Sequence, residues 1–129
     1  MEDKQYVLLP LTEDLWQSFT LTLSINGDLF YARVEVRYLP APAVWVLSVW
    51  DHVTGELLVN MVKLVCSYVH LNDLMLPFAG RRDGAGMGSL FVIRRVDAPA
   101  TPDPSKGNLT EFRVLWGDSI VQPGIQSSD

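Results

Sequence analysis

An Asn-Gly pair separates two segments in which apolar and polar residues alternate. The first segment covers residues 18–25 and the second residues 28–38, so only Asn26 and Gly27 lie between them. A two-residue turn of type I′ requires positive φ at both central positions, which Asn and Gly tolerate best. The pattern therefore predicts a tight antiparallel hairpin and a protein built mainly from β-sheet.

The alternation also assigns a buried and a solvated face to these two strands. The apolar positions are Phe19, Leu21, Leu23, Ile25, Phe30, Ala32, Val34, Val36 and Tyr38. The other side of the second strand carries Tyr31, Arg33, Glu35 and Arg37. Such a charged face is typical of an antiparallel sheet with one side in water. It would also suit a polar contact with another subunit.

Further strands are predicted at residues 6–9, 44–50, 56–69, 90–95 and 109–116. The segment 56–69 reads as two short strands with a bend near residues 60–63, and a buried helix is the alternative. Turns or loops are expected at 51–55, 80–88 and 97–108, and a turn or a short helix at 71–78. These elements predict an all-β fold, a small antiparallel β-sandwich or barrel-like domain with long loops. The 129 residues suit one domain, residues 1–129, with a core at about 6–116 and a C-terminal tail at 117–129.

Charge and hydropathy argue against two classes of partner. The net charge is −5, with 15 acidic against 10 basic residues, whereas nucleic-acid binders usually show the opposite balance. The most hydrophobic uncharged stretch, Leu39 to Trp50, is too short to span a bilayer and contains two prolines. The charged N-terminal residues do not resemble a secretory signal. We expect a soluble protein that folds in a cytoplasm and has no membrane or sequence-specific nucleic-acid partner.

The pattern of reactive residues predicts no enzyme. Cys66 lies in an apolar stretch that is typical of a packed, inert thiol. His52 and His70 have no second His or Cys at metal-ligand spacing. The glycines of residues 84–88 match neither the dinucleotide fingerprint nor the phosphate-binding loop. We therefore expect no catalytic residue, no metal and no cofactor. A hydrolase would have to assemble polar groups around His52 or His70.

Tryptophan and arginine supply the candidate contact residues. The tryptophans are Trp16, Trp45, Trp50 and Trp116. A domain of this size rarely buries four indoles completely, so we select Trp16, Trp45 and Trp116 as interface candidates. Arg81 and Arg82, in the glycine-rich loop, could bind carboxylates of an acidic partner. A flexible surface hairpin is the simpler interpretation of that loop.

An ordered series of short segments extends over most of residues 6–116. It consists of Leu8-Leu9-Pro10-Leu11, Gln17-Ser18-Phe19-Thr20-Leu21, residues 31–37, residues 45–49, Asp51, Gly55, Leu57-Leu58, residues 90–93 and residues 112–116. In this order the chain resembles the small baseplate plug proteins of contractile-tailed phages. The loops at 80–88 and 97–108 look longer or more divergent than in that family.

The resemblance implies a structural protein of the virion, without catalytic residues, near the central hub of the tail. Its partners would be other baseplate, hub and tube subunits, bound through edge strands and the two long loops after assembly in the host cytoplasm. Tail hubs have threefold or sixfold symmetry, so we expect a homotrimer. The alternative is a small β-type binding module that recognises a glycan or a peptide through exposed tryptophans.

Overall fold

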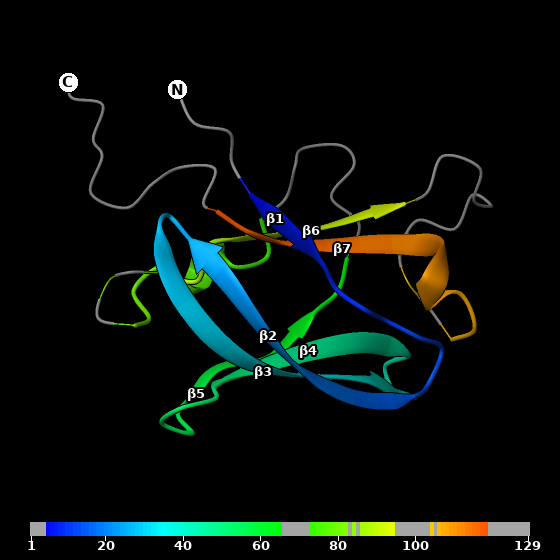
Figure 1. The fold of residues 1–129 in the computed structure, drawn as a ribbon. Coiled ribbons are helices and arrows are strands. Elements are labelled where there is room, and N and C mark those ends of the chain that lie inside the picture. The colour runs from blue at the N-terminus through cyan, green and yellow to red at the C-terminus, as the bar shows by residue number, and fades with distance from the viewer. Residues whose placement is uncertain are drawn as a thin grey trace.

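The computed structural model describes residues 5–65, 73–82, 84, 86–94, 104 and 106–118. In these ranges the chain forms seven β-strands and two short 3₁₀ helices (Figure 1). The strands are β1 (Tyr6–Leu8), β2 (Trp16–Ile25), β3 (Asp28–Leu39), β4 (Val44–Asp51), β5 (Leu57–Lys63), β6 (Ser89–Arg94) and β7 (Phe112–Gly117). The 3₁₀ helices are η1 (Leu76–Phe78) and η2 (Leu109–Glu111). The predicted all-β class is confirmed.

The strands form two antiparallel sheets. One has three strands in the order β1-β7-β6, and the other has four in the order β2-β3-β4-β5. Figure 1 shows the three-stranded sheet lying over one face of the four-stranded sheet. The core contains residues of both sheets, and the ring of Phe30 on β3 meets that of Trp116 on β7 at 6.0 Å. The domain is therefore a sandwich, because each sheet buries one face against the other.

The hairpin between β2 and β3 forms at the predicted place. Asn26 and Gly27 have φ of 55° and 87°, the positive values that a type I′ turn requires. The pairing runs from Ile25 opposite Asp28 to Trp16 opposite Arg37. The side chains of Ala32, Val34 and Val36 are fully buried on β3, which confirms the alternation read from the sequence.

The predicted segment 56–69 is described up to residue 65, and this part forms the strand β5 and no helix. β5 pairs with β4, but the pairing has register shifts, and Met61 has a positive φ of 56°. The last strand begins at Phe112, because η2 occupies the three residues before it. Cys66, His70, residues 95–103 and residues 119–129 lie outside the described residues. Of the helices in the described ranges, neither η1 nor η2 has the length and hydropathy needed to cross a membrane.

Candidate functional site

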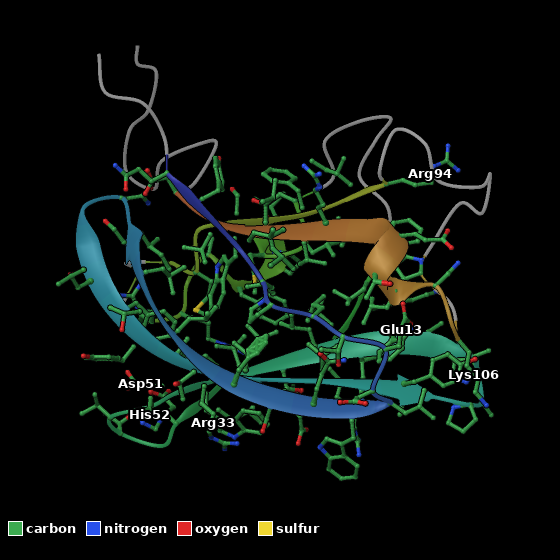
Figure 2. All side chains as sticks on the ribbon, turned by 45° about the vertical axis from the view of Figure 1, so that its right-hand side comes forward. Glu13, Arg33, Asp51, His52, Arg94 and Lys106 are labelled. Carbon is green, nitrogen blue, oxygen red and sulfur yellow. The ribbon has the colours of Figure 1, made fainter. Side chains whose placement is uncertain are left out.

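The side of the four-stranded sheet that faces away from the core carries tryptophan and arginine in adjacent rows. Trp16 on β2 lies opposite Arg37 on β3, and Arg33 on β3 lies opposite Trp50 on β4. Directly paired residues of antiparallel strands point to the same side of a sheet. Figure 2 shows Arg33 on the side away from the three-stranded sheet. We call the set Trp16, Arg33, Glu35, Arg37 and Trp50 the aromatic–arginine face.

The side chains of this face hold one another in place. The Arg37 guanidinium carbon lies 5.0 Å from the centre of the Trp16 ring. The indole N–H of Trp16 donates to Oε2 of Glu35 at 2.7 Å. The Arg33 guanidinium carbon lies 4.1 Å from the centre of the Trp50 ring. Each cation–π contact at an exposed site contributes roughly 0.5–1 kcal/mol. Side chains that are already ordered lose less entropy when a partner binds.

Shorter residues of β4 lie beneath these long side chains. Val46 is 5% and Ser48 is 3% exposed, although both belong to the outer side of the sheet. Ser48 Oγ accepts the N–H of Met61 at 2.9 Å, and Arg37 Nη2 lies 3.3 Å from the sulfur of Met61. The outer face is therefore a packed layer over the sheet, and not a set of independent surface side chains.

The charge of this face is opposite to that of the whole chain. Lys63 lies opposite Val46, in the same row as Arg37. It therefore adds a third basic side chain beside Arg33 and Arg37 of the face, against the one carboxylate of Glu35. Among the residues that the structure describes, none of the three basic side chains has a carboxylate within 4.0 Å. A positive patch on a chain of net charge −5 favours a partner that presents carboxylates.

The structure separates the predicted interface tryptophans into two groups. Trp16 is 65% exposed, as a contact residue requires. Trp45 and Trp116 are fully buried, so the expectation that they contact a partner is corrected. Trp45 packs edge-on against Tyr38 at 5.4 Å, and the indole N–H of Trp116 donates to the carbonyl of Met87 at 2.6 Å. Both indoles fill the core because their strand positions face the opposite sheet.

Trp50 was not selected from the sequence, yet it belongs to the aromatic–arginine face. A signal for it was present. Arg33 is one of the polar residues that alternate with the apolar positions of β3. The next strand pairs antiparallel with β3 and sets Trp50 opposite Arg33. Only the register was missing, because the loop between β3 and β4 gives no turn type as clear as Asn-Gly.

Arg82 serves the fold and is not free to bind an acidic partner. Its Nη2 forms an ion pair with Asp28 at 2.6 Å, and its Nη1 donates to the carbonyl of Gly86 at 2.9 Å. The guanidinium also lies 4.5 Å from the centre of the Phe30 ring, and the side chain is only 11% exposed. These contacts attach the glycine-rich loop to the start of β3, so the interface expectation for Arg82 is corrected.

Arg81 is exposed, but its side chain is also used within the chain. Its Nε donates to the carbonyl of Leu58 on β5 at 2.9 Å. The guanidinium carbon lies 5.9 Å from the Phe78 ring centre. The two arginines therefore join the loop to different strands of the four-stranded sheet and do not form one basic cluster with the aromatic–arginine face.

Polar groups elsewhere stabilise turns. Asp51 Oδ1 accepts the N–H groups of Val53 and Thr54 at 2.8 and 3.2 Å in the turn that includes the exposed His52. Glu13 accepts the N–H groups of Leu109 and Thr110 and the hydroxyl of Thr110. Partial burial raises the pKa of Glu13, but these hydrogen bonds outweigh it, so the pKa lies below the ordinary value. The labelled Glu13 and His52 lie at different ends of the molecule in Figure 2.

One hollow lies beside η2 and the start of β7. Its volume is about 240 Å³, and it is lined by Leu8, Leu9, Leu11, Thr110, Phe112 and Arg113. The lining is largely apolar, and the Thr110 hydroxyl is already bonded to Glu13. In the described part of the chain, no three His, Cys, Asp or Glu side chains come together in a way that could hold a metal ion. The hollow is therefore a weaker candidate for a functional site than the aromatic–arginine face.

The geometry thus makes the aromatic–arginine face the candidate surface for contact with another molecule. Comparison with known proteins adds no family to this description: no protein-family model matches the chain, and a search of curated proteins found no match.

Proposed function

We propose that this protein is a structural subunit that docks on another protein through the aromatic–arginine face. We further propose that it serves as a plug or hub component in the tail baseplate of a contractile-tailed phage or a related particle. The observation that carries the docking proposal is the ordered set of Trp16, Arg37 and Glu35 beside Arg33 and Trp50.

Residue chemistry supports a protein partner for this face. Tryptophan and arginine are enriched at protein interfaces and supply a large share of the binding energy there. Trp16 offers an indole that is 65% exposed, and Arg33 offers a planar set of donors that suits carboxylates. The excess of basic groups favours an acidic surface on the partner.

The assignment to a phage baseplate depends on the ordered series of segments over residues 6–116. The two-sheet domain is compatible with it, because a plug must close or line a tube through protein contacts that later rearrange. Such a role requires edges, faces and loops for contact, and it requires no catalytic group.

The test is incorporation into particles. Tail particles purified from the phage or host that encodes the protein should contain it in a fixed ratio to the other tail proteins, as measured by quantitative mass spectrometry. A Trp16→Ala/Arg37→Ala variant should be under-represented by about tenfold, the effect of losing ~1.4 kcal/mol of binding free energy. Leu29→Ala, at an exposed position of β3 on the same side of the sheet, is the matched control and should be incorporated normally.

Two results would contradict the proposal. If purified particles lack the protein, the baseplate assignment is wrong. If the Trp16→Ala/Arg37→Ala variant is folded and incorporated as well as the control, the face is not the docking surface.

A glycan-binding module is the second candidate, and the exposure of Trp16 favours it. An open indole flanked by the polar groups of Glu35 and Arg37 is suited to stacking on a sugar ring. This candidate predicts that glycans shift the tryptophan fluorescence of the isolated protein and that Trp16→Ala abolishes the shift. A protein whose fluorescence no glycan changes would eliminate it.

A further inference from the structure

β2 is an edge strand without the features that protect the other edges of the two sheets. Its ten residues contain no charged residue and no proline. The edge β1 has only three residues. On the edge β6, the carbonyl of Leu90 accepts the N–H of Leu74, and its N–H donates to Asp73, both at 3.0 Å. The edge β5 is interrupted by register shifts. Long, regular, uncharged edges are sites where another strand can pair.

The hairpin turn determines which backbone groups of β2 point outward. Ile25 and Asp28 flank a two-residue turn and therefore form a hydrogen-bonded pair, so the odd-numbered residues of β2 bond to β3. The even-numbered residues Ser18, Thr20, Thr22 and Ser24 direct their N–H and C=O groups away from the sheet. Within the described ranges, these groups bond to no other residue. The edge is available for pairing over most of its length.

The apolar side chains near the middle of β2 are also incompletely covered. Leu23 and Ile25, close to the turn, are 3% and 1% exposed. Phe19 and Leu21 point to the same side but are only half-buried. An added strand would cover these two side chains on one side of the sheet and meet Thr20 on the other.

We propose that the partner of this edge is the β2 strand of a second copy, paired antiparallel about a twofold axis at Thr20. In this register Ser18 of one copy meets Thr22 of the other, and Phe19 meets Leu21. Between residues 18 and 22, polar residues meet polar residues and apolar residues meet apolar ones, and no like charges oppose each other. Every outward backbone group from Ser18 to Ser24 gains a partner.

A twofold pair of β2 strands fits the open edge of β2 better than a ring of three copies does. A threefold ring requires β2 to meet a different edge of the next copy, but the edges β5 and β6 are irregular or already bonded. In the twofold dimer the two four-stranded sheets become continuous, so both aromatic–arginine faces lie on one side. The proposal goes beyond docking on that face, because it concerns how two copies pair.

The experiment is sedimentation velocity of the full chain over a range of concentrations. The wild type should be a dimer at about 100 μM, where even a Kd of several μM leaves mostly dimer. Thr20→Pro should be a monomer with an unchanged far-UV circular dichroism spectrum, because the N–H it removes points outward and bonds to nothing in β3. Thr20→Lys places two ammonium groups opposite each other and should raise the Kd by at least about tenfold.

A matched control and a register test make the result specific. Asn60→Lys adds the same charge to the exposed, opposite edge of the same sheet and should leave the dimer intact. Ser18→Lys/Thr22→Lys should dissociate the dimer, whereas Ser18→Lys/Thr22→Glu should preserve it, because Ser18 of one copy meets Thr22 of the other.

A monomeric or trimeric wild type, or a dimer that both Thr20 variants leave unchanged, would overturn the proposal. If Thr20→Pro fails to fold, Thr20→Lys still decides, because its side chain lies on the outer side of the sheet. Failure here leaves particle incorporation through Trp16 and Arg37 untouched, so the two proposals are separable.

Discussion

Replacement of Gly88 by alanine should weaken the three-stranded sheet through two distinct effects. Gly88 stands where the glycine-rich loop enters β6, and its φ is +73°. A Cβ atom at this position would lie 1.9 Å from the carbonyl oxygen of Gly117. Gly117 pairs with Ser89 on β6 and with Tyr6 on β1. The contact therefore lies where all three strands of the sheet meet.

The two effects have different magnitudes. The left-handed backbone conformation costs a residue with a Cβ about 1–2 kcal/mol relative to glycine. A carbon atom and a carbonyl oxygen normally stay more than about 3.3 Å apart, so the two backbones must separate by more than an ångström. Overpacking of this kind typically costs about 1–3 kcal/mol. The free energy of unfolding should therefore fall by about 2–5 kcal/mol, out of roughly 5–15 for a typical domain.

Gly84 provides the matched control for this prediction. It has the same kind of backbone conformation, with φ of +86°, but a Cβ there would meet nothing within 4 Å. Gly84→Ala should lose only the conformational part, about 1–2 kcal/mol. Urea denaturation followed by circular dichroism measures both variants. Equal losses in Gly84→Ala and Gly88→Ala would refute the argument, because the contact with Gly117 would then cost nothing.

Three further measurements test the core, the loop attachment and the turn contacts. Trp116→Phe removes a buried indole and its hydrogen bond, so urea denaturation should show a loss of about 2–4 kcal/mol in the free energy of unfolding. Trp16→Phe, at an exposed position, should lose less than about 0.5 kcal/mol. Similar losses for both variants would contradict the assignment of one indole to the core and the other to the surface. A double-mutant cycle of Arg82→Ala and Asp28→Ala should give a coupling energy of about 0.5–1 kcal/mol, because Asp28 is 63% exposed. A coupling energy near zero would show that this ion pair does not stabilise the attachment of the loop. Because the folded-state pKa of Glu13 is lowered, its carboxylate stabilises the fold above its ordinary pKa, and this gain disappears as the pH falls through the lowered value. Glu13→Gln should therefore be less stable than the wild type by about 0.5–1 kcal/mol at pH 7 after allowance for solvent screening. In thermal melts, the melting temperatures of the two proteins should become equal at low pH. A difference that stays the same at every pH would argue against the carboxylate as the cause.

Much of the four-stranded sheet is predictable from short stretches of sequence. The Asn26-Gly27 pair specifies the turn because few residues accept positive φ at two successive positions. The alternation in residues 28–38 then specifies which side chains face the core, since successive residues of a strand point to opposite sides. Arg33 and Arg37 were therefore correctly placed on the side away from the apolar residues.

The candidate site was predicted less completely. Trp16 was selected and is exposed, but Trp45 and Trp116 were selected and are buried. A strand with apolar residues on both sides, as in residues 44–50, does not reveal which side faces the opposite sheet. Trp50 was missed because the loop before its strand did not reveal the register with the preceding strand, although Trp50 lies on the face with Arg33.

The sequence alone determined the class of fold, the hairpin and the two sides of its strands, because turn chemistry and alternation act over a few neighbouring residues. The tertiary structure alone decided which indoles are buried, that Arg82 is bonded to Asp28, 54 positions away, and that β2 lies at an edge. The order of strands in a sheet depends on contacts between segments far apart in the chain, and no local pattern encodes that order. Both proposed contact surfaces of this protein, the aromatic–arginine face and the β2 edge of the same sheet, follow from this strand order.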